Sequence, residues 1–478
     1  MGTGATSGQA AFWDLERFLA GACEAHDPLG VIEPECERRG RELVRLALQA
    51  HLDARGDGDA GPGIVVEGPD GPVALSRRRS RSRRVMTLFG EVRLTRVGYG
   101  EPGVAGVYPL DAELGLPARC WSYEICRRLV RAAVCGPFDE ALMLVRETTG
   151  VKMSKRSAEQ VVVDAAADVA SFYASREGLV PGAGDVLVAA IDCKGIPMVR
   201  PDPAPKVVRR RKGEKANKKR MATVGAVHSQ APQPRTTADV VASLFDPPGP
   251  GARHHPRRQR ADKRVWASLS AGKDAFITDV RAEMCRRDPG RAHAWVIVTD
   301  GERALQRKVA TTFEDVTLVL DLLHVLDKLW KAAHVFHREG SPEAIAFVRA
   351  RTERVLNGQV GQVVKGLRQM STKRALRGTG AKAIADVTRY LYANRDRMRY
   401  DTYLANGWPI ASGTVEGACK NIVRDRMERS GMRWCEPGAE AVLQLRATYL
   451  SGDFDAYWEW HTAQDQRRLH PPFSIGPK

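Results

Sequence analysis

The segment VLVAAID, from Val186 to Asp192, is an apolar run that ends in an acidic residue. Two later segments repeat the pattern, AWVIVTD at residues 294–300 and VTLVLD at residues 316–321. Short apolar runs bounded by turn residues are typical of buried strands. GERALQRKVATTF, residues 301–313, lies between the last two and has helical periodicity. This alternation of strands and helices predicts an α/β fold with a mixed sheet.

Asp192, Asp300 and Asp321 end these predicted strands, where a sheet fixes the backbone and the side chain projects from its edge. Carboxylates set this way are ligands that Mg²⁺ prefers, and two such ions can act together on a phosphodiester. A single Asp is equally well explained as a turn or cap residue. Asp300 and Asp321 compete for the second ligand position. Asp321 and His324 fall on one helical face, either as a structural pair or as groups that brace the site or contact DNA.

A fourth acid, Glu416, lies in SGTVEGACKNIVR, residues 412–424, which has helical periodicity and begins at a potential cap, Ser412. Glu416, Lys420 and Arg424 share one face of the predicted helix. They form either an i,i+4 ion pair or a metal ligand flanked by two phosphate-binding cations. Periodicity alone does not choose between these interpretations.

The chain carries 74 Lys and Arg against 57 Asp and Glu, a formal net charge of +17. A surplus of this size, gathered in runs, favours a polyanionic partner over a merely solvated surface. One run, RRRSRSRR, precedes a predicted β-hairpin that turns at Gly90, and its arginines are either phosphate contacts or a solvated linker. The candidate DNA-binding residues are Arg77, Arg78, Arg79, Arg81, Arg83, Arg84, Lys155, Arg156, Arg209, Arg210, Arg211, Lys218, Lys219 and Arg220.

Composition shifts and periodicity divide the chain into regions. Two amphipathic helices are expected within residues 11–54, and a second pair, joined by TTGVKMSKR with Ser157 as a cap, is either a helix-turn-helix or a plain helical hairpin. RVWASLSAGKDAFITDVRAEMCRR, residues 264–287, is predicted to be helical throughout. The predicted regions are a helical N-terminal region (1–60), a hairpin plus a helix-turn-helix-like region (61–180), a catalytic core (181–321 and 407–435), a helical insertion (322–406) and a helical C-terminal tail (436–478).

The nine cysteines are scattered and form no CxxC pair, which suits a reducing cytoplasm. No apolar run of about 18 residues is present and the N-terminus does not resemble a signal peptide, so we expect a soluble protein with no membrane partner. No phosphate-binding glycine motif is present, so no nucleotide cofactor is expected.

RMRYDTYLANGWPIASGTVEGACKNIVRDRMERSGMRW, Arg397 to Trp434, resembles bacterial insertion-sequence transposases of the ISKra group, which are DDE enzymes of the Mutator-like superfamily. The combination of GWPIASGTVE, CK and SGMRW is more specific than any spacing of acids. YPLDAELGLP, DEAL with its following helix, DCKGIPM and DLLHVLDKLW also match, and the similarity runs from about Val85 to Trp458.

The resemblance implies an RNase H-like catalytic core interrupted by a long helical insertion. It implies that Asp192, Asp300 and Glu416 hold two Mg²⁺ or Mn²⁺ ions, and that Asp321 and His324 match the family's C/DxxH motif, with Lys420 and Arg424 in support. The expected activity is cleavage of double-stranded DNA at terminal inverted repeats and strand transfer into target DNA. A homodimer or larger assembly would do this in the bacterial cytoplasm, at the nucleoid. The alternatives are an RNase H-fold nuclease or resolvase without strand transfer, and a transposase-derived DNA-binding regulator.

Overall fold

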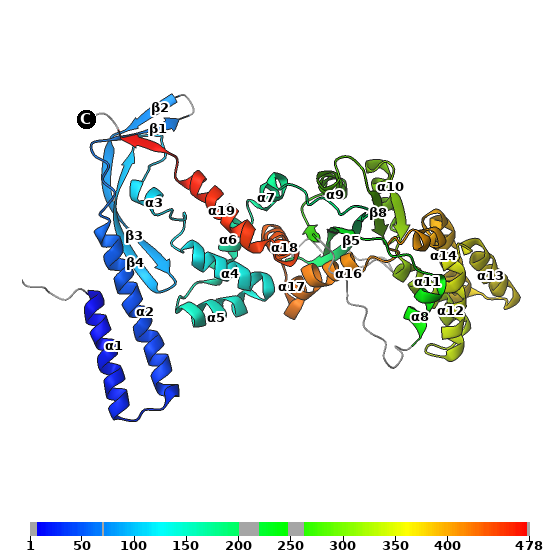
Figure 1. Ribbon diagram of the computed structural model, residues 1–478. Helices are drawn as coiled ribbons and strands as arrows, with labels where there is room; N and C mark the ends of the chain where they lie inside the picture. The colour runs from blue at the N-terminus through cyan, green and yellow to red at the C-terminus, as the bar shows by residue number, and fades with distance from the viewer. Residues whose placement is uncertain (1–6, 69–70, 200–218, 247–261, 476–478) are drawn as a thin grey trace, which may run out of the picture. The chain divides into compact units, whose positions relative to one another are not determined.

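A computed structural model of the chain describes residues 7–68, 71–199, 219–246 and 262–475 (Figure 1). The chain forms two compact units, one of residues Ser175–Gly452 and one that combines Met1–Ala174 with Asp453–Lys478. This division differs from the predicted C-terminal tail. Helix α18, Glu436–Ser451, belongs to the first unit and packs on its sheet, whereas α19, Phe454–Leu469, belongs to the second.

The unit Ser175–Gly452 is built on a five-stranded sheet with the strand order β7-β6-β5-β8-β9. Strands β5, β6 and β7 pair antiparallel, and β8 and β9 continue the sheet parallel to β5. The predicted mixed α/β sheet is therefore confirmed. The strands are β5 Val186–Pro197, β6 Lys219–Gln230, β7 Arg264–Ser268, β8 Ala294–Thr299 and β9 Thr317–Leu320.

The central strands are covered on both faces, which explains why they are nearly continuous apolar runs. On one face, α9 (Lys273–Arg287) and α10 (Arg303–Thr312) pack their apolar residues against alternate residues of β5, such as Leu187 and Ile191. Helix α16, Gly413–Ala418, also contacts β5 and β6.

The prediction of one helix over residues 264–287 is wrong at its N-terminal end, where Arg264–Ser268 is strand β7. Val265 and Ala267 alternate inward along this strand, and its backbone pairs with β6. The pairing partner is remote in sequence, so the local pattern did not reveal the strand.

Between β9 and α16 the chain is helical, as predicted for residues 322–406. The two ends of this segment meet, because the Leu322 N–H donates to the Ile410 carbonyl at 2.9 Å. The helices are α11 Leu322–Phe336, α12 Pro342–Leu356, α13 Val360–Lys373, α14 Gly378–Asn394 and α15 Tyr400–Ala405, with a 3₁₀ turn at Arg395–Arg397; α8, Thr237–Phe245, packs on α12.

The second unit begins with two helices, α1 Ser7–Glu24 and α2 Leu29–Ala54, which pack on each other. The arginine run does not precede the predicted hairpin but is part of it: β3 is Arg77–Thr87 and pairs with β4, Gly90–Gly100, across a turn where Gly90 has φ +124°. A second sheet, in the order β10-β1-β2, was not predicted because its strands are short and β10 is remote in sequence from β1 and β2. It contains β1 Ile64–Gly68, β2 Gly71–Leu75 and β10 Phe473–Ile475.

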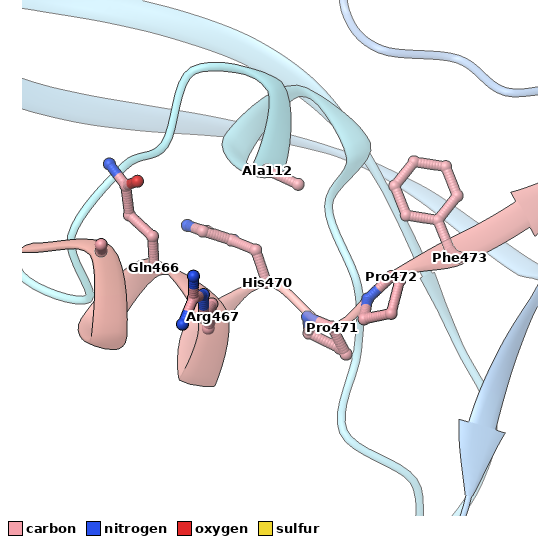
Figure 2. Close-up of a pocket in the computed structure, with 8 residues that line it drawn as sticks. Ala112, Gln466, Arg467, His470, Pro471, Pro472 and Phe473 are labelled. Atoms are coloured by element: carbon pink, nitrogen blue, oxygen red, sulfur yellow. The ribbon is translucent and has the colours of Figure 1, made fainter. Parts of the chain in front are cut away.

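A helical layer completes this unit. Ser154 caps α6 (Lys155–Ala165) by accepting the Ser157 N–H at 3.1 Å, so the prediction that Ser157 is the cap is wrong. Figure 2 shows a pocket between the end of α19 and α3 (Pro109–Glu113), with Gln466, His470 and Phe473 around it. The helices are α3 Pro109–Glu113, α4 Tyr123–Cys135, α5 Phe138–Thr149, α6 Lys155–Ala165 and α7 Val169–Ser175.

In the described part of the chain, no helix combines the length and the apolar character needed to cross a membrane.

Candidate metal centre

Three aspartates lie in a row across one edge of the five-stranded sheet. Ile191 on β5 pairs with Thr299 on β8, so Asp192 and Asp300 follow at neighbouring positions. Asp321 directly follows β9, and its N–H donates to the Thr299 carbonyl at 2.9 Å. The prediction that Asp192 ends its strand is wrong, because β5 continues to Pro197 and Asp192 pairs with Val224 of β6. Asp300 and Asp321 directly follow their strands as predicted, and the sheet brings the three carboxyl groups together.

Asp192 links this edge to the segment that carries Glu416. One carboxylate oxygen accepts the Cys193 N–H at 2.6 Å, and the other accepts the Cys419 thiol at 3.3 Å. Burial, followed by the charge of Asp192, raises the pKa of the Cys419 thiol, which therefore remains protonated and able to donate. Because Cys419 lies three residues after Glu416, this contact brings Glu416 toward the aspartates.

Asp300 is fixed from two sides. Its carboxylate accepts the Glu302 N–H at 2.9 Å, and its backbone carbonyl accepts the Tyr390 hydroxyl of α14 at 3.0 Å. Burial raises the pKa of Asp300 above its ordinary value, and the negative charge of Asp192 adds to this effect.

Glu416 lies on α16 and is partly buried. Burial raises its pKa, the charges of Asp321 and Asp192 raise it further, and His324 opposes them. The charge of Asp192 therefore opposes ionisation of both Asp300 and Glu416, and the charge of Asp321 opposes ionisation of Glu416. A bound cation would relieve this repulsion.

Asp321 is completely buried and acts as a clamp. One oxygen accepts the Leu323 N–H at 2.7 Å and so caps α11, and the other accepts the Ser412 N–H at 3.0 Å and the Ser412 hydroxyl. The predicted side-chain cap from Ser412 is therefore wrong, because its hydroxyl serves Asp321 instead. The sequence could not show this role of Ser412.

Within the described ranges, one group of three potential ligands is close enough to share an ion: Asp321, His324 and Glu416 each offer an atom within 4.8 Å of the others. Asp192, Asp300 and Glu416 do not form such a group here. Both Asp321 oxygens are already hydrogen-bonded, so Glu416 and His324 are the freer members. Carboxylate oxygens suit Mg²⁺ and Mn²⁺, and the imidazole favours Mn²⁺.

Lys420 and Arg424 are exposed on a π-helical turn, Cys419–Arg424, that continues α16. No ion pair joins Glu416 to Lys420 or Arg424 in the described part of the chain. The predicted inward face is confirmed, since Val415, Cys419, Ile422 and Val423 are buried. The π-turn changes the helical register, so the three residues do not keep the i, i+4, i+8 alignment; such turns are frequent at functional sites.

The arginines of β3 have unequal surroundings. Arg83 is largely buried and donates to Asp111 at 2.6 Å and to backbone carbonyls, whereas Arg79 and Arg81 are exposed and make no ion pair with another described residue. The Arg83 guanidinium is thus bound within the protein, and Arg79 and Arg81 are the accessible cations. The other three are exposed but pair with acids: Arg77 with Glu101, Arg78 with Asp59, and Arg84 with Glu91.

Among the remaining candidate DNA contacts, Lys155 pairs with Asp139 at 3.0 Å, and Arg156 is exposed at the start of α6. Lys219 pairs with Glu428 at 2.6 Å and Arg220 pairs with Glu436, both at the start of β6. Arg209, Arg210, Arg211 and Lys218 lie outside the described residues.

No family model matches the chain, and a search of curated proteins finds none that is similar to it.

Proposed function

We propose that this protein is a DDE transposase, which cuts double-stranded DNA at the ends of an insertion sequence and joins those ends to target DNA. The observation that carries the proposal is the placement of Asp192 and Asp300 on adjacent strands, with Glu416 brought toward them by the contact between Cys419 and Asp192. The family resemblance of Arg397 to Trp434, which contains Glu416, points the same way.

The strand order supports an RNase H-like core for the unit Ser175–Gly452. Three antiparallel strands are followed by two strands parallel to the first, and the first strand lies at the centre of the sheet. In such a core, the acids that act on a phosphodiester stand on the first and fourth strands, which here are β5 and β8.

Asp192, Asp300 and Glu416 would hold Mg²⁺ or Mn²⁺, with His324 beside Glu416, and the ions would neutralise phosphate charge and activate the attacking oxygen. The chain's own residues set the geometry. Asp321 holds the start of α16, and Tyr390 fixes the backbone of Asp300. The exposed cations Lys420 and Arg424 are suited to bind non-bridging phosphate oxygens beside Glu416.

The test uses DNA that flanks the gene, with the inverted repeats as substrate and pre-cut ends for a separate joining assay. Asp192→Asn, Asp300→Asn and Glu416→Gln should each lower cleavage and joining by about a thousandfold or more, while binding of the same DNA changes little. Asp396→Asn, which removes an exposed carboxylate, is the control and should retain activity.

Retained cleavage in the Asp192→Asn variant would contradict the proposed site. Cleavage without joining by the wild-type protein would indicate a nuclease, and binding with neither reaction would indicate a DNA-binding regulator. An active protein should assemble on DNA as a dimer or larger complex that brings both ends together.

A further inference from the structure

Residues from three helices, α10, α13 and α14, line a groove of about 720 Å³. Helices α13 and α14 pack side by side in the helical segment between β9 and α16 (Figure 1). The lining consists of Arg303, Arg368, Ser371, Thr372, Ala381, Ile384, Ala385, Thr388, Arg389, Tyr392 and Ala393.

The chemistry of this lining suits phosphate. Arg303, Arg368 and Arg389 are exposed, and no carboxylate lines the groove. Arg389 pairs with Asp386 at 3.0 Å, but both side chains are more than half exposed, and an ion pair of that kind contributes little and exchanges readily. Guanidinium groups bind phosphate oxygens in a bidentate manner, so three of them along one groove can hold successive phosphates.

The charge of the surrounding segment supports this interpretation. Residues 360–394 contain seven basic residues and a single acid, Asp386. An excess of this kind, concentrated on two helices, creates a local positive potential that attracts a polyanion.

Tyr392 indicates that the groove suits a single strand better than a duplex. Its side chain is 51% exposed and lines the groove beside these arginines. The Arg395 guanidinium lies over one face of the ring, 4.4 Å from the centroid, so a base would stack on the other face. Exposed aromatic rings next to cations provide stacking surfaces for unpaired bases, whereas the bases of a duplex are not accessible to stacking.

The groove lies next to the carboxylates. Arg303 follows Asp300 by three residues, at the start of α10. Tyr390 lies on α14 between Arg389 and Tyr392, and its hydroxyl donates to the Asp300 carbonyl. A strand with a phosphodiester at Asp300 can therefore continue into the groove.

We propose that this groove binds one unpaired DNA strand next to the cleavage point, with Arg303, Arg368 and Arg389 holding phosphates and Tyr392 stacking on a base. The identity of the polyanion rests on the proposed function. Fraying of a few base pairs at the element end would supply the unpaired strand.

The test measures binding of a fluorescein-labelled single-stranded DNA oligonucleotide to the full-length chain, by anisotropy, in EDTA and over a range of salt concentrations. The double variant Arg368→Ala/Arg389→Ala should bind about tenfold more weakly, and its salt slope should fall by roughly 1.4, because each phosphate contact on a single strand contributes about 0.7. Tyr392→Ala should weaken binding of the single strand and leave binding of a duplex of the same sequence unchanged.

The matched control is Arg281→Ala/Lys331→Ala, which removes the same charge from exposed positions of α9 and α11, outside the groove and outside residues 360–394. It should bind within about twofold of the wild-type protein. Equal losses in the two double variants, or no loss in the groove variant, would overturn the inference.

This readout is independent of catalysis. If the groove binds single-stranded DNA but the protein cuts no DNA, the proposed function is refuted and the inference that the groove binds a single strand is supported. If the protein cleaves and joins DNA normally but the groove variant binds the single strand as tightly as the wild-type protein does, only the inference about the groove is refuted.

Discussion

The carboxylate of Asp321, at the end of β9, accepts hydrogen bonds from both the backbone N–H and the hydroxyl of Ser412, 91 residues later in the chain. The other oxygen of the same carboxylate caps α11. One buried side chain therefore fixes both the start of the helical segment and its return to the sheet. Because the Glu416 N–H donates to the Ser412 carbonyl at 3.0 Å, this closure also determines where Glu416 lies relative to the sheet.

Replacement of Ser412 by alanine should lower the free energy of unfolding of the unit Ser175–Gly452 by about 1–3 kcal/mol, because it removes one donor from a fully buried carboxylate. Denaturant titration at neutral pH measures the change. Ser80→Ala, at an exposed position of β3, is the control and should cost less than about 0.5 kcal/mol. Equal effects of the two substitutions would show that the clamp contributes no stability.

Gly301, between Asp300 and α10, is a position where a side chain should strongly destabilise the protein. Its φ is +87°, and a Cβ there would lie 2.6 Å from the Tyr390 hydroxyl and 2.8 Å from Leu320 Cδ1. Gly301→Ala should therefore destabilise the protein by about 2–4 kcal/mol, as measured by thermal unfolding. Gly290→Ala, where no atom would lie within 4 Å, is the control.

A double variant tests the cause of that loss. Adding Tyr390→Phe to Gly301→Ala removes the closest atom, so part of the stability should return. If the double variant is less stable than Gly301→Ala by the full cost of Tyr390→Phe alone, the clash with Tyr390 is not the cause.

The sequence revealed β8 and β9 and the aspartates that follow them, because both strands are local apolar runs with an acid and a turn or helix signal after them. The apolar run of β5 was also visible, but the strand continues past Asp192 to Pro197 because it pairs with β6, which is a separate segment of the chain. The sequence pattern did not reveal strand β7. Its five residues lead directly into a helical pattern, and only pairing with β6 makes them a strand. Local periodicity predicts elements whose burial is continuous, but it does not detect short edge strands.

For the candidate site too, the sequence predicted features that depend on neighbouring residues and missed those that depend on remote ones. Asp321 could be placed near His324 from their spacing, but its partner Ser412 is remote in sequence, so the choice between a ligand and a structural role stayed open. The arginines of β3 looked equivalent as a run. The difference between Arg83 and Arg81 arises because Asp111, which also pairs with Arg96, lies beside Arg83 in the folded unit.

Metal binding should stabilise the protein. If Mg²⁺ or Mn²⁺ binds only the folded state, an ion at a hundred times its Kd adds about 2.7 kcal/mol, which a thermal shift relative to EDTA detects. His324→Ala should reduce the shift with Mn²⁺ more than the shift with Mg²⁺, since an imidazole nitrogen prefers Mn²⁺. His334→Ala, an exposed position on the same helix, should reduce neither. No loss with either ion would exclude His324 as a ligand, and equal losses would contradict its preference for Mn²⁺ over Mg²⁺.

Acid should weaken the unit Ser175–Gly452 through Glu283 of α9. Burial alone would raise the pKa of Glu283, but Arg264, Arg287 and Arg286 surround it and lower the pKa to about 2. The unfolded-state value is near 4.5, so the stabilisation is fully present above that pH and is lost as the pH falls toward 2.

Glu283→Gln should therefore lower the free energy of unfolding by about 3 kcal/mol at pH 7, because buried guanidinium groups lose their counter-charge. The difference from the wild-type protein should shrink as the pH falls from about 4.5 toward 2, because the unfolded chain takes up the proton first and the folded carboxylate takes it up only near pH 2. Urea titrations across this range measure both curves, with the exposed Glu159→Gln as the control that should track the wild-type protein throughout. A constant gap between the Glu283→Gln and wild-type curves would mean that the charge of Glu283 is not the source of the acid sensitivity.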